Sequence, residues 1–302
     1  MLNTRVIVNP AAGAGATAKK WPRVRKALES SGMRFEHDLT EAPGHATELA
    51  KSAVGRGYDM VVSVGGDGTL NEIVNGLYSA GANGTVMLGI ISTGTGKDYI
   101  KTVGIPRPYE EACLRLCNPK KIVVDLGTVE YMSNGRMEKR IFVNFAGLGL
   151  DAEIVRATTR RFKALGSMPS YLMGVFSSLV LHRNKDVVIT LDGKTERRQV
   201  DEVLVNNGKY GGGGMLPAPD ADLKDGILDV LIINAASKPE LVLSLPRIYK
   251  GTHGTHPKVT MIRARMIEVQ SAQPMLVQAD GELLGEAPAR FDVLPAALTV
   301  AI

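Results

Sequence analysis

The chain has 302 residues, of which 44% are hydrophobic and 22% are charged, and it carries 33 glycines. Its length exceeds that of a typical domain of ~100 to 200 residues, so two packed units are expected, and the composition excludes a disordered or fibrous protein. The net charge of +5 favours anionic partners such as nucleotides, nucleic acid or an acidic membrane surface, without choosing among them.

Residues 1–120 alternate short apolar runs with amphipathic stretches. Strict alternation of strand and helix implies a parallel sheet with helices on its faces. We therefore predict a Rossmann-like parallel-sheet nucleotide domain over 1–120, whose working loops lie at the carboxyl ends of the strands. The predicted strands are RVIVN (5–9), MRFEHDL (33–39), DMVVSVG (59–65) and VMLGIIS (86–92).

After about residue 121 most apolar runs read as strands without helices between them, among them RIFVNFAGLG (140–149) and ILDVLIIN (227–234). Asn134-Gly135 and Asp192-Gly193 are dipeptides preferred in tight hairpins. We therefore predict a β-rich, antiparallel, sandwich-like domain over 121–289.

Helices are expected to interrupt this second domain at 151–165, 168–182 and 237–250, and Pro246 should end or bend the last of them. The final segment, 290–302, is expected to form a strand that can return to the first domain.

Glycine-rich loops follow three predicted strands of the first domain, at 9–15 (NPAAGAG), 65–68 (GGDG) and 92–98 (STGTGKD). Without a Cβ, glycine lets main-chain amides approach a phosphate, and the helix expected to begin near Thr69 favours anions at its amino end. Asp67 is unfavourable beside phosphate unless a metal cation or a proton-transfer role compensates. The loops therefore predict a nucleotide-phosphate site.

The motifs NPAAG, GGDGTLNE and GTGKDY, followed by GGGGMLPAPDADLKDGILDV and QADGE, resemble the bacterial lipid kinase family built on the diacylglycerol-kinase catalytic domain. The resemblance runs essentially end to end, and GGDGTLNE is its most specific element. It implies transfer of the ATP γ-phosphoryl group to a lipid hydroxyl with Mg²⁺, and diacylglycerol is the expected acceptor.

The resemblance also implies roles for single residues. Glu282 is expected to accept the proton of the lipid hydroxyl, and Asp67 and Asp98 are expected to lie near the transferred phosphate. The expected ligands of a structural magnesium are Asp222, Asp225 and the main chain of Ile227. The residues expected to hold ATP are Asn9, Pro10, Ala11, Ala12, Gly13, Thr40, Gly65, Gly66, Asp67, Gly68, Thr69, Leu70, Asn71 and Thr95.

Two lysines depart from the family pattern. Lys97 stands where relatives usually carry Asn in the third loop, although a lysine can still reach phosphate. Lys224 stands beside Asp225 where several relatives have a second acid, which weakens the expected metal site. Without the resemblance, an acidic surface turn is the better interpretation of residues 220–226.

Several alternatives stay open. Gly13-x-Gly15-x-x-Ala18 satisfies the loose dinucleotide fingerprint, with Glu36 and Asp38 about where a ribose-binding acid falls, so an NAD-dependent dehydrogenase is the main rival. A NAD kinase, a kinase for a sphingoid base or phosphatidylglycerol, and a catalytically silent lipid-binding regulator are the others.

The sequence predicts a cytoplasmic protein that touches the membrane from one side. Cys113 and Cys117 read as buried free thiols, and no signal peptide is visible. Arg156, Arg160 and Lys163 recur at helical spacing beside the apolar segment 171–182, which is shorter than the ~20 residues that cross a bilayer. This combination suits peripheral contact with an anionic membrane.

Nucleic acid is not an expected partner, because aromatic residues make up only 5% of the chain and show no stacking pattern among the basic residues. The pair His253 and His256 in THGTHPK is expected to be structural or on the surface, since no third metal ligand is nearby. A homo-oligomer is compatible with the sequence.

Overall fold

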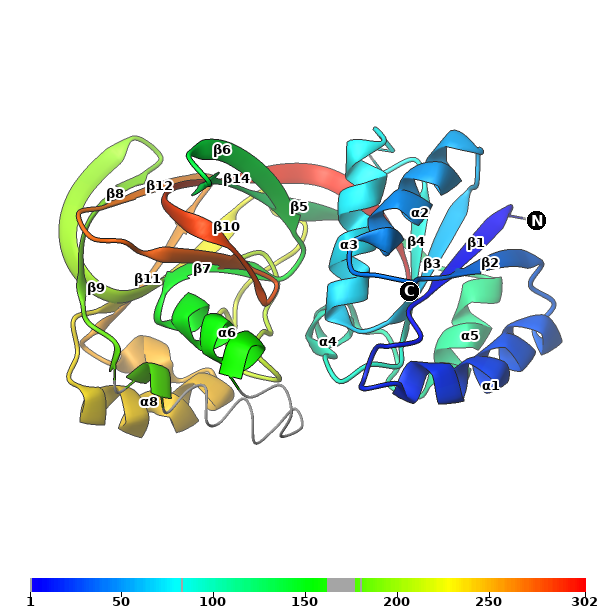
Figure 1. Ribbon diagram of the computed structural model, residues 1–302, viewed down its shortest axis with the longest axis horizontal. Coiled ribbons are helices and arrows are strands. Elements are labelled where there is room, and N and C mark those ends of the chain that lie inside the picture. The colour runs from blue at the N-terminus through cyan, green and yellow to red at the C-terminus, as the bar shows by residue number, and fades with distance from the viewer. Residues whose placement is uncertain (1, 83, 162–176, 180) are drawn as a thin grey trace. The chain divides into compact units, whose positions relative to one another are not determined.

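A computed structural model describes residues 2–82, 84–161, 177–179 and 181–302. The chain divides into two compact units, one made of Met1–Leu126 and Pro295–Ile302 and the other of Gly127–Leu294 (Figure 1). The first unit alternates strands with helices, and the second consists mainly of strands. The predicted two-domain α/β fold with a β-rich second domain is confirmed.

The strands of the first unit pair in the order β2, β1, β3, β4, and each of these pairs is parallel. Residues 299 and 300 of the last strand of the chain add to β4, also in parallel. Every residue of β3 is buried, as is typical of a parallel strand covered on both faces. The strands are β1 (Thr4–Val8), β2 (Phe35–Leu39), β3 (Met60–Gly65) and β4 (Met87–Ser92).

Helices connect these strands, and two of them contribute to an apolar core. Leu28 of α1 and Cys113 of α5 pack with Val62 and Ile91 of the strands. Cys117 is exposed because it ends its helix, so only one of the two expected buried thiols is buried. The helices are α1 (Ala16–Ser30), α2 (His45–Gly55), α3 (Asp67–Ser79), α4 (Asp98–Val103) and α5 (Tyr109–Cys117).

Strand pairing in the second unit is antiparallel and returns to its starting point. The circuit runs β12, β8, β9, β7, β13, β14 and back to β12, which leaves few free strand edges. The strands are β5 (Lys121–Ser133), β6 (Arg136–Phe142), β7 (Phe145–Gly149), β8 (Lys185–Leu191), β9 (Lys194–Asn206), β10 (Leu228–Asn234), β11 (Val259–Ala264), β12 (Met266–Ser271), β13 (Leu276–Ala279) and β14 (Glu282–Ala301).

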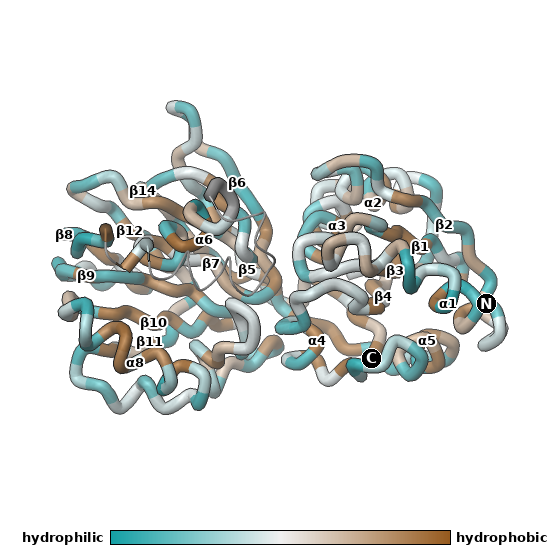
Figure 2. Tube along the Cα trace, turned by 60° about the horizontal axis from the view of Figure 1, so that its bottom comes forward, coloured by the Kyte–Doolittle hydropathy of each residue, from teal (hydrophilic) through white to brown (hydrophobic). Residues whose placement is uncertain are grey.

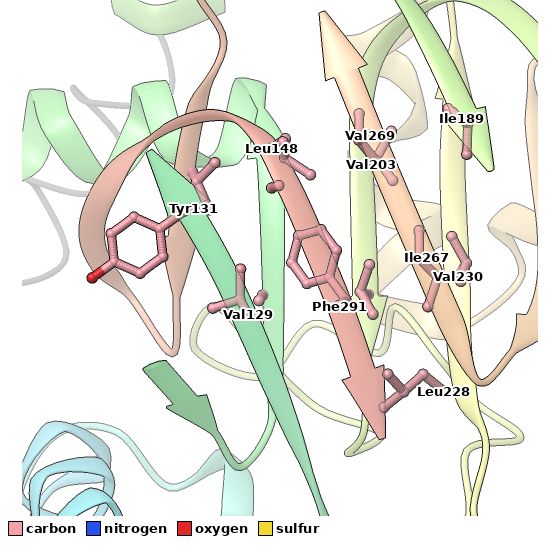
Figure 3. Packing of buried hydrophobic residues seen from close by; sticks show 14 of the residues in the cluster. Val129, Tyr131, Leu148, Ile189, Val203, Leu228, Val230, Ile267, Val269 and Phe291 are labelled. Carbon is pink, nitrogen blue, oxygen red and sulfur yellow. The ribbon is translucent and has the colours of Figure 1, made fainter. Parts of the chain in front are cut away.

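Side chains from these strands fill one apolar core (Figure 3). Phe291 of β14 is fully buried and meets Phe142 edge to face, with ring centroids 6.5 Å apart. Val129 of β5 and Ile267 of β12 belong to the same cluster. Val277 and Ala279 of β13 belong to this core, and Leu284 of β14 packs against it, so the core supports the strands that carry Gln278 and Glu282.

Tight hairpins occur at both predicted dipeptides. Asn134-Gly135 has φ angles of 49° and 76°, and Asp192-Gly193 has 46° and 84°, so all four residues are left-handed as this turn type requires. Asp280-Gly281, with 46° and 83°, forms a third turn of the same kind between β13 and β14. This third turn places Glu282 at the first position of β14.

One helix of the second unit, α8, differs from the sequence prediction, and a second is described only in part. The helix expected at 151–165 is described as α6 (Leu150–Arg161), and 168–182 lies mostly outside the described residues. Helix α8 (Lys238–Lys250) runs through Pro246. It buries none of its residues, so water can satisfy the carbonyl that a proline leaves without a partner. In the described part of the chain, no helix is both long and apolar enough to span a bilayer.

Candidate functional site

The three glycine-rich loops of the first unit lie together at the carboxyl ends of β1, β3 and β4. The side-chain amide of Asn9 donates to Thr69 Oγ1 over 2.9 Å, which joins the first loop to the second. The main-chain N–H groups of Thr93 and Gly94 donate to the carbonyl of Gly65 over 2.8 and 3.0 Å, which joins the third loop to the second. The predicted loops therefore form one surface.

Glycine is required at Gly94 by the close approach of two backbones. A Cβ at this position would lie 2.7 Å from the Cα of Gly66, which real side chains do not allow. A Cβ at Gly13 would in turn lie 3.3 Å from the Cα of Gly94. At Gly68, by contrast, a Cβ would meet no atom within 4 Å, so close packing does not require glycine at this position.

Gly94→Ala is expected to lower the free energy of unfolding by about 1 to 3 kcal/mol, because the added methyl group forces the second and third loops apart. Gly68→Ala is the matched control and should unfold like the wild type. Urea denaturation of the three proteins measures the effect. Equal stability of all three would show that the loops are not in contact at Gly94.

Asp67 is the first residue of α3, two positions before the predicted start at Thr69. The chain turns through Gly66 alone, so the carboxylate of Asp67 lies in the first helical turn. Its Oδ2 accepts the N–H of Asp98 over 3.3 Å, which brings two of the predicted catalytic residues together. Asp98 is buried and pairs with Lys101 over 3.5 Å.

The residues predicted to hold ATP differ in what they can offer. Leu70 is buried in the core, so only its main chain is available, whereas Thr95 is exposed at the tip of the third loop. Asn71 is buried and its Oδ1 accepts a hydrogen bond from Asn75 over 3.0 Å. Thr40 follows β2 and donates its N–H to Val8 over 2.8 Å, beside the first loop.

In the second unit, Glu282 is partly buried and pairs with Arg140, whose Nη2 lies 2.7 Å from Oε2. The turn before it is held by Asp280, whose carboxylate accepts the N–H groups of Val143, Asn144 and Phe145 at 2.7, 2.9 and 3.1 Å. These bonds explain why the single strand predicted over 140–149 is divided into β6 and β7. Arg140 thus holds the side chain of Glu282, and Asp280 holds the turn that precedes it.

A second carboxyl group lies behind this turn. Gln278 donates its amide N–H to Asp151 Oδ2 over 2.6 Å, and its Oε1 accepts the N–H of Gly281 over 2.9 Å. Burial raises the pKa of Asp151 to about 7, and burial together with the charge of Asp151 raises that of its neighbour Glu202. One proton shared between these two acids keeps the pair from carrying two negative charges.

His182 is buried between two carboxylates: Nδ1 lies 2.8 Å from Glu153 Oε2, and Nε2 lies 3.0 Å from Asp201 Oδ1. Burial lowers the pKa of His182, but the hydrogen bonds and charges of Asp201 and Glu153 outweigh it and raise the pKa to about 9. The folded pKa therefore exceeds the unfolded value of about 6.5. The resulting stabilisation is complete below pH 6.5 and is lost as the pH rises towards 9.

The free energy of unfolding is expected to fall by about 3 kcal/mol between pH 6 and pH 9.5 through this histidine alone. In His182→Gln that part of the pH dependence should be missing. Denaturation curves of both proteins across this range provide the comparison. The assignment would be wrong if the two proteins lost stability in parallel.

The predicted magnesium turn is held by its own main chain. Asp222 Oδ1 accepts the N–H of Lys224, and Asp225 Oδ1 accepts the N–H of Ile227, both over 3.1 Å. Arg263 pairs with the other oxygen of Asp225. Within the described ranges, no group of three or more His, Cys, Asp or Glu side chains is placed to hold a metal ion.

Comparisons with known proteins place both units in one family. The diacylglycerol kinase catalytic domain matches residues 3–129, and the YegS C-terminal NAD kinase beta sandwich-like domain matches residues 144–302. The chain belongs to the bacterial diacylglycerol kinase and YegS-like lipid kinase family. It is an ATP-dependent lipid kinase.

Individual members of this lipid kinase family are similar over nearly the full length. A diacylglycerol kinase of Bacillus subtilis is 31% identical over 96% of this chain and 93% of its own, and one of Staphylococcus carnosus is 30% identical over 95% and 90%. A crystal structure from Bacillus anthracis has a TM-score of 0.78 at 26% identity, covering 99% of this chain and 94% of that one.

The residues that suggested a dehydrogenase or a metal pair make contacts within the protein. Glu36 and Asp38, the acids of the dehydrogenase alternative, both pair with Arg5. His253 is buried and its Nε2 lies 3.0 Å from the carbonyl of Pro217, while His256 is partly buried. Sequence reasoning missed Arg140, Asp151 and Gln278. Of these three, only Gln278 lies in a recognised motif, because it is the first residue of QADGE.

Proposed function

We propose that this lipid kinase transfers the γ-phosphoryl group of ATP to the hydroxyl of diacylglycerol and forms phosphatidic acid. The observation that carries the proposal is the meeting of the three loops around Asp67 at the amino end of α3. The full-length relatives named diacylglycerol kinase support the choice of acceptor.

The loops of the first unit would bind the triphosphate. The main-chain N–H groups in the first turn of α3, at the helix amino end, are suited to anionic oxygens. Phosphoryl transfer needs in-line positioning and neutralised charge more than covalent help from the protein. Mg²⁺ bound with ATP supplies part of that neutralisation, and the carboxylate of Asp67 is the group that would hold it. Lys97 begins the turn into α4 and is placed in the same loop as Thr95.

Glu282 would act as general base on the acceptor hydroxyl. Its pairing with Arg140 holds the carboxylate in a fixed orientation. When the hydroxyl oxygen attacks the γ-phosphorus, its proton passes to Glu282 and the bond to the β-phosphate oxygen breaks. Asp280 and Gly281 hold the base at the start of β14.

Purified protein incubated with labelled ATP and a panel of diacylglycerol, sphingoid base, phosphatidylglycerol and NAD tests the proposal. Label in phosphatidic acid alone is the expected result. Label found only in another lipid or only in NAD would identify that compound as the acceptor in place of diacylglycerol. NAD is the second candidate because the matched carboxyl-terminal domain is described as NAD kinase beta sandwich-like. ATP binding without any labelled product would indicate a silent regulator.

We also propose peripheral contact with an anionic membrane on the cytoplasmic side. Helix α8 contains apolar residues, which colour parts of its tube brown in Figure 2. Among them, Leu243 is 76% and Tyr249 48% exposed. Lys238, Arg247 and Lys250 on the same helix supply positive charge. Of the basic stripe in the sequence, Arg156 is exposed, while the side chains of Arg160 and Lys163 lie outside the described residues.

Sedimentation with liposomes distinguishes this contact. Binding should require anionic lipid and weaken with salt, and Leu243→Ser should reduce it. Salt-independent binding, or none, would count against the membrane contact but not against the kinase reaction.

A structural magnesium at Asp222, Asp225 and Ile227 stays a proposal. A cation at this turn would have to compete with Arg263 for Asp225. Metal analysis of wild-type protein and Asp222→Asn after dialysis decides it: equal metal content in both would remove the site.

A further inference from the structure

The polar network behind the Glu282 turn includes Asp151 of α6 and Gln278 of β13, and Glu202 lies against Asp151. None of these residues belongs to the proposed phosphate loops or to the general base. Gln278 is fully buried, and a buried amide whose hydrogen bonds are satisfied has a fixed orientation. The network can therefore act on the turn through geometry.

The orientation of Gln278 follows from its partners. A main-chain N–H can only donate, so the amide oxygen of Gln278 must face Gly281, 2.9 Å away. Its NH₂ group then faces Asp151, whose Oδ2 accepts over 2.6 Å. Asp151 Oδ1 is already used by the N–H of Ala152 over 2.6 Å. Asp151 also shares a proton with Glu202, so the relay is anchored on its far side by a second buried acid.

Asp151 is itself closely enclosed. A Cβ on Gly147 of β7 would lie 2.6 Å from Asp151 Oδ2 and 2.6 Å from a methyl carbon of Leu204. Gly147 is also the residue opposite Gln278 in the pairing of β7 with β13. The carboxylate therefore lies directly against the backbone of the strand that neighbours β13.

We propose that Asp151 and Gln278 are positioning residues for Glu282: the Asp151 carboxylate orients the Gln278 amide, which fixes the Gly281 N–H and so the direction in which β14 presents the general base. This inference rests on the proposed role of Glu282. It predicts that hydrogen-bond polarity at the two positions matters more than size or charge.

Single substitutions break the match of donor and acceptor between the two side chains. In Asp151→Asn the new side-chain amide would turn its NH₂ group towards Gln278, so that the Gln278 amide flips and its own NH₂ opposes the Gly281 N–H. Gln278→Glu would place two carboxyl groups face to face. Each variant is expected to lower kcat about 10 to 100-fold at an unchanged KM for ATP, the size of effect that a small displacement of a catalytic group produces.

The double variant Asp151→Asn/Gln278→Glu restores the relay with the same total charge. Its side chain at position 151 donates to one carboxylate oxygen at position 278, whose other oxygen accepts the Gly281 N–H. We expect kcat within about threefold of wild type, a non-additive result that marks direct coupling. A double variant no better than the poorer single variant would overturn the proposal, as would full activity in both single variants.

Hydrogen exchange at the Gly281 amide separates this inference from the proposed function. Exchange should be slow in the wild type and the double variant and faster in each single variant, at equal thermal unfolding midpoints. If the wild type phosphorylates no lipid, the proposed function fails, and the exchange pattern still decides whether the relay exists. Equal exchange in all four proteins would show that it does not.

Discussion

Replacing Glu282 with alanine is expected to lower phosphoryl transfer to the lipid by roughly 10² to 10⁴-fold, the range that a general base contributes. Binding of ATP should not change, because the loops that would hold it are in the first unit. Steady-state kinetics with varied ATP and varied lipid measure both effects. The thermal unfolding midpoint should stay close to wild type, since Glu282 is only partly buried.

Glu286→Ala is the matched control, because it removes an exposed carboxylate four residues later on the same strand. It should leave turnover intact. Glu282→Gln keeps the size and a hydrogen bond to Arg140 but cannot accept a proton, so it should be nearly as inactive as the alanine variant. High activity in Glu282→Gln would exclude proton acceptance and leave a purely structural role.

Asp67→Asn is expected to reduce transfer by at least about 10²-fold, because a carboxylate that neutralises the metal–phosphate charge is lost. Stability should be preserved, since the Asn oxygen can still accept the N–H of Asp98. Activity measured over a series of Mg²⁺ concentrations should show a weaker apparent affinity for the metal.

Glu48→Gln provides the comparison for Asp67, because Glu48 is an exposed acid in the first turn of α2. Neutralising it changes the net charge equally without touching the loops. If Asp67→Asn were as active as Glu48→Gln, the phosphate site would have to be placed elsewhere.

Local sequence signals predicted the loops and the turns correctly. The Asn-Gly and Asp-Gly dipeptides act through their own φ angles and through the strands that flank them. These loops and turns can therefore be predicted from neighbouring residues alone. The order of strands and loops in the first unit could be inferred for the same reason.

Contacts between distant residues were not predictable in this way. Arg140 meets Glu282 across 142 residues, and Asp151 meets Gln278 across 127. The break between β6 and β7 has the same origin, because the N–H groups of Val143 to Phe145 are taken by Asp280. Pro246 remains within α8 because a helix without buried residues tolerates a missing bond.

Strand β14 has a consequence for how the polypeptide matures. Its early residues pair with β13 and β12, and its last ones, Thr299 and Val300, pair with β4, more than two hundred positions earlier. During translation β4 is synthesised long before β14. The outer edge of β4 therefore stays unpaired until the ribosome has synthesised the rest of the second unit. Folding of the amino-terminal half is thereby tied to completion of the acceptor half.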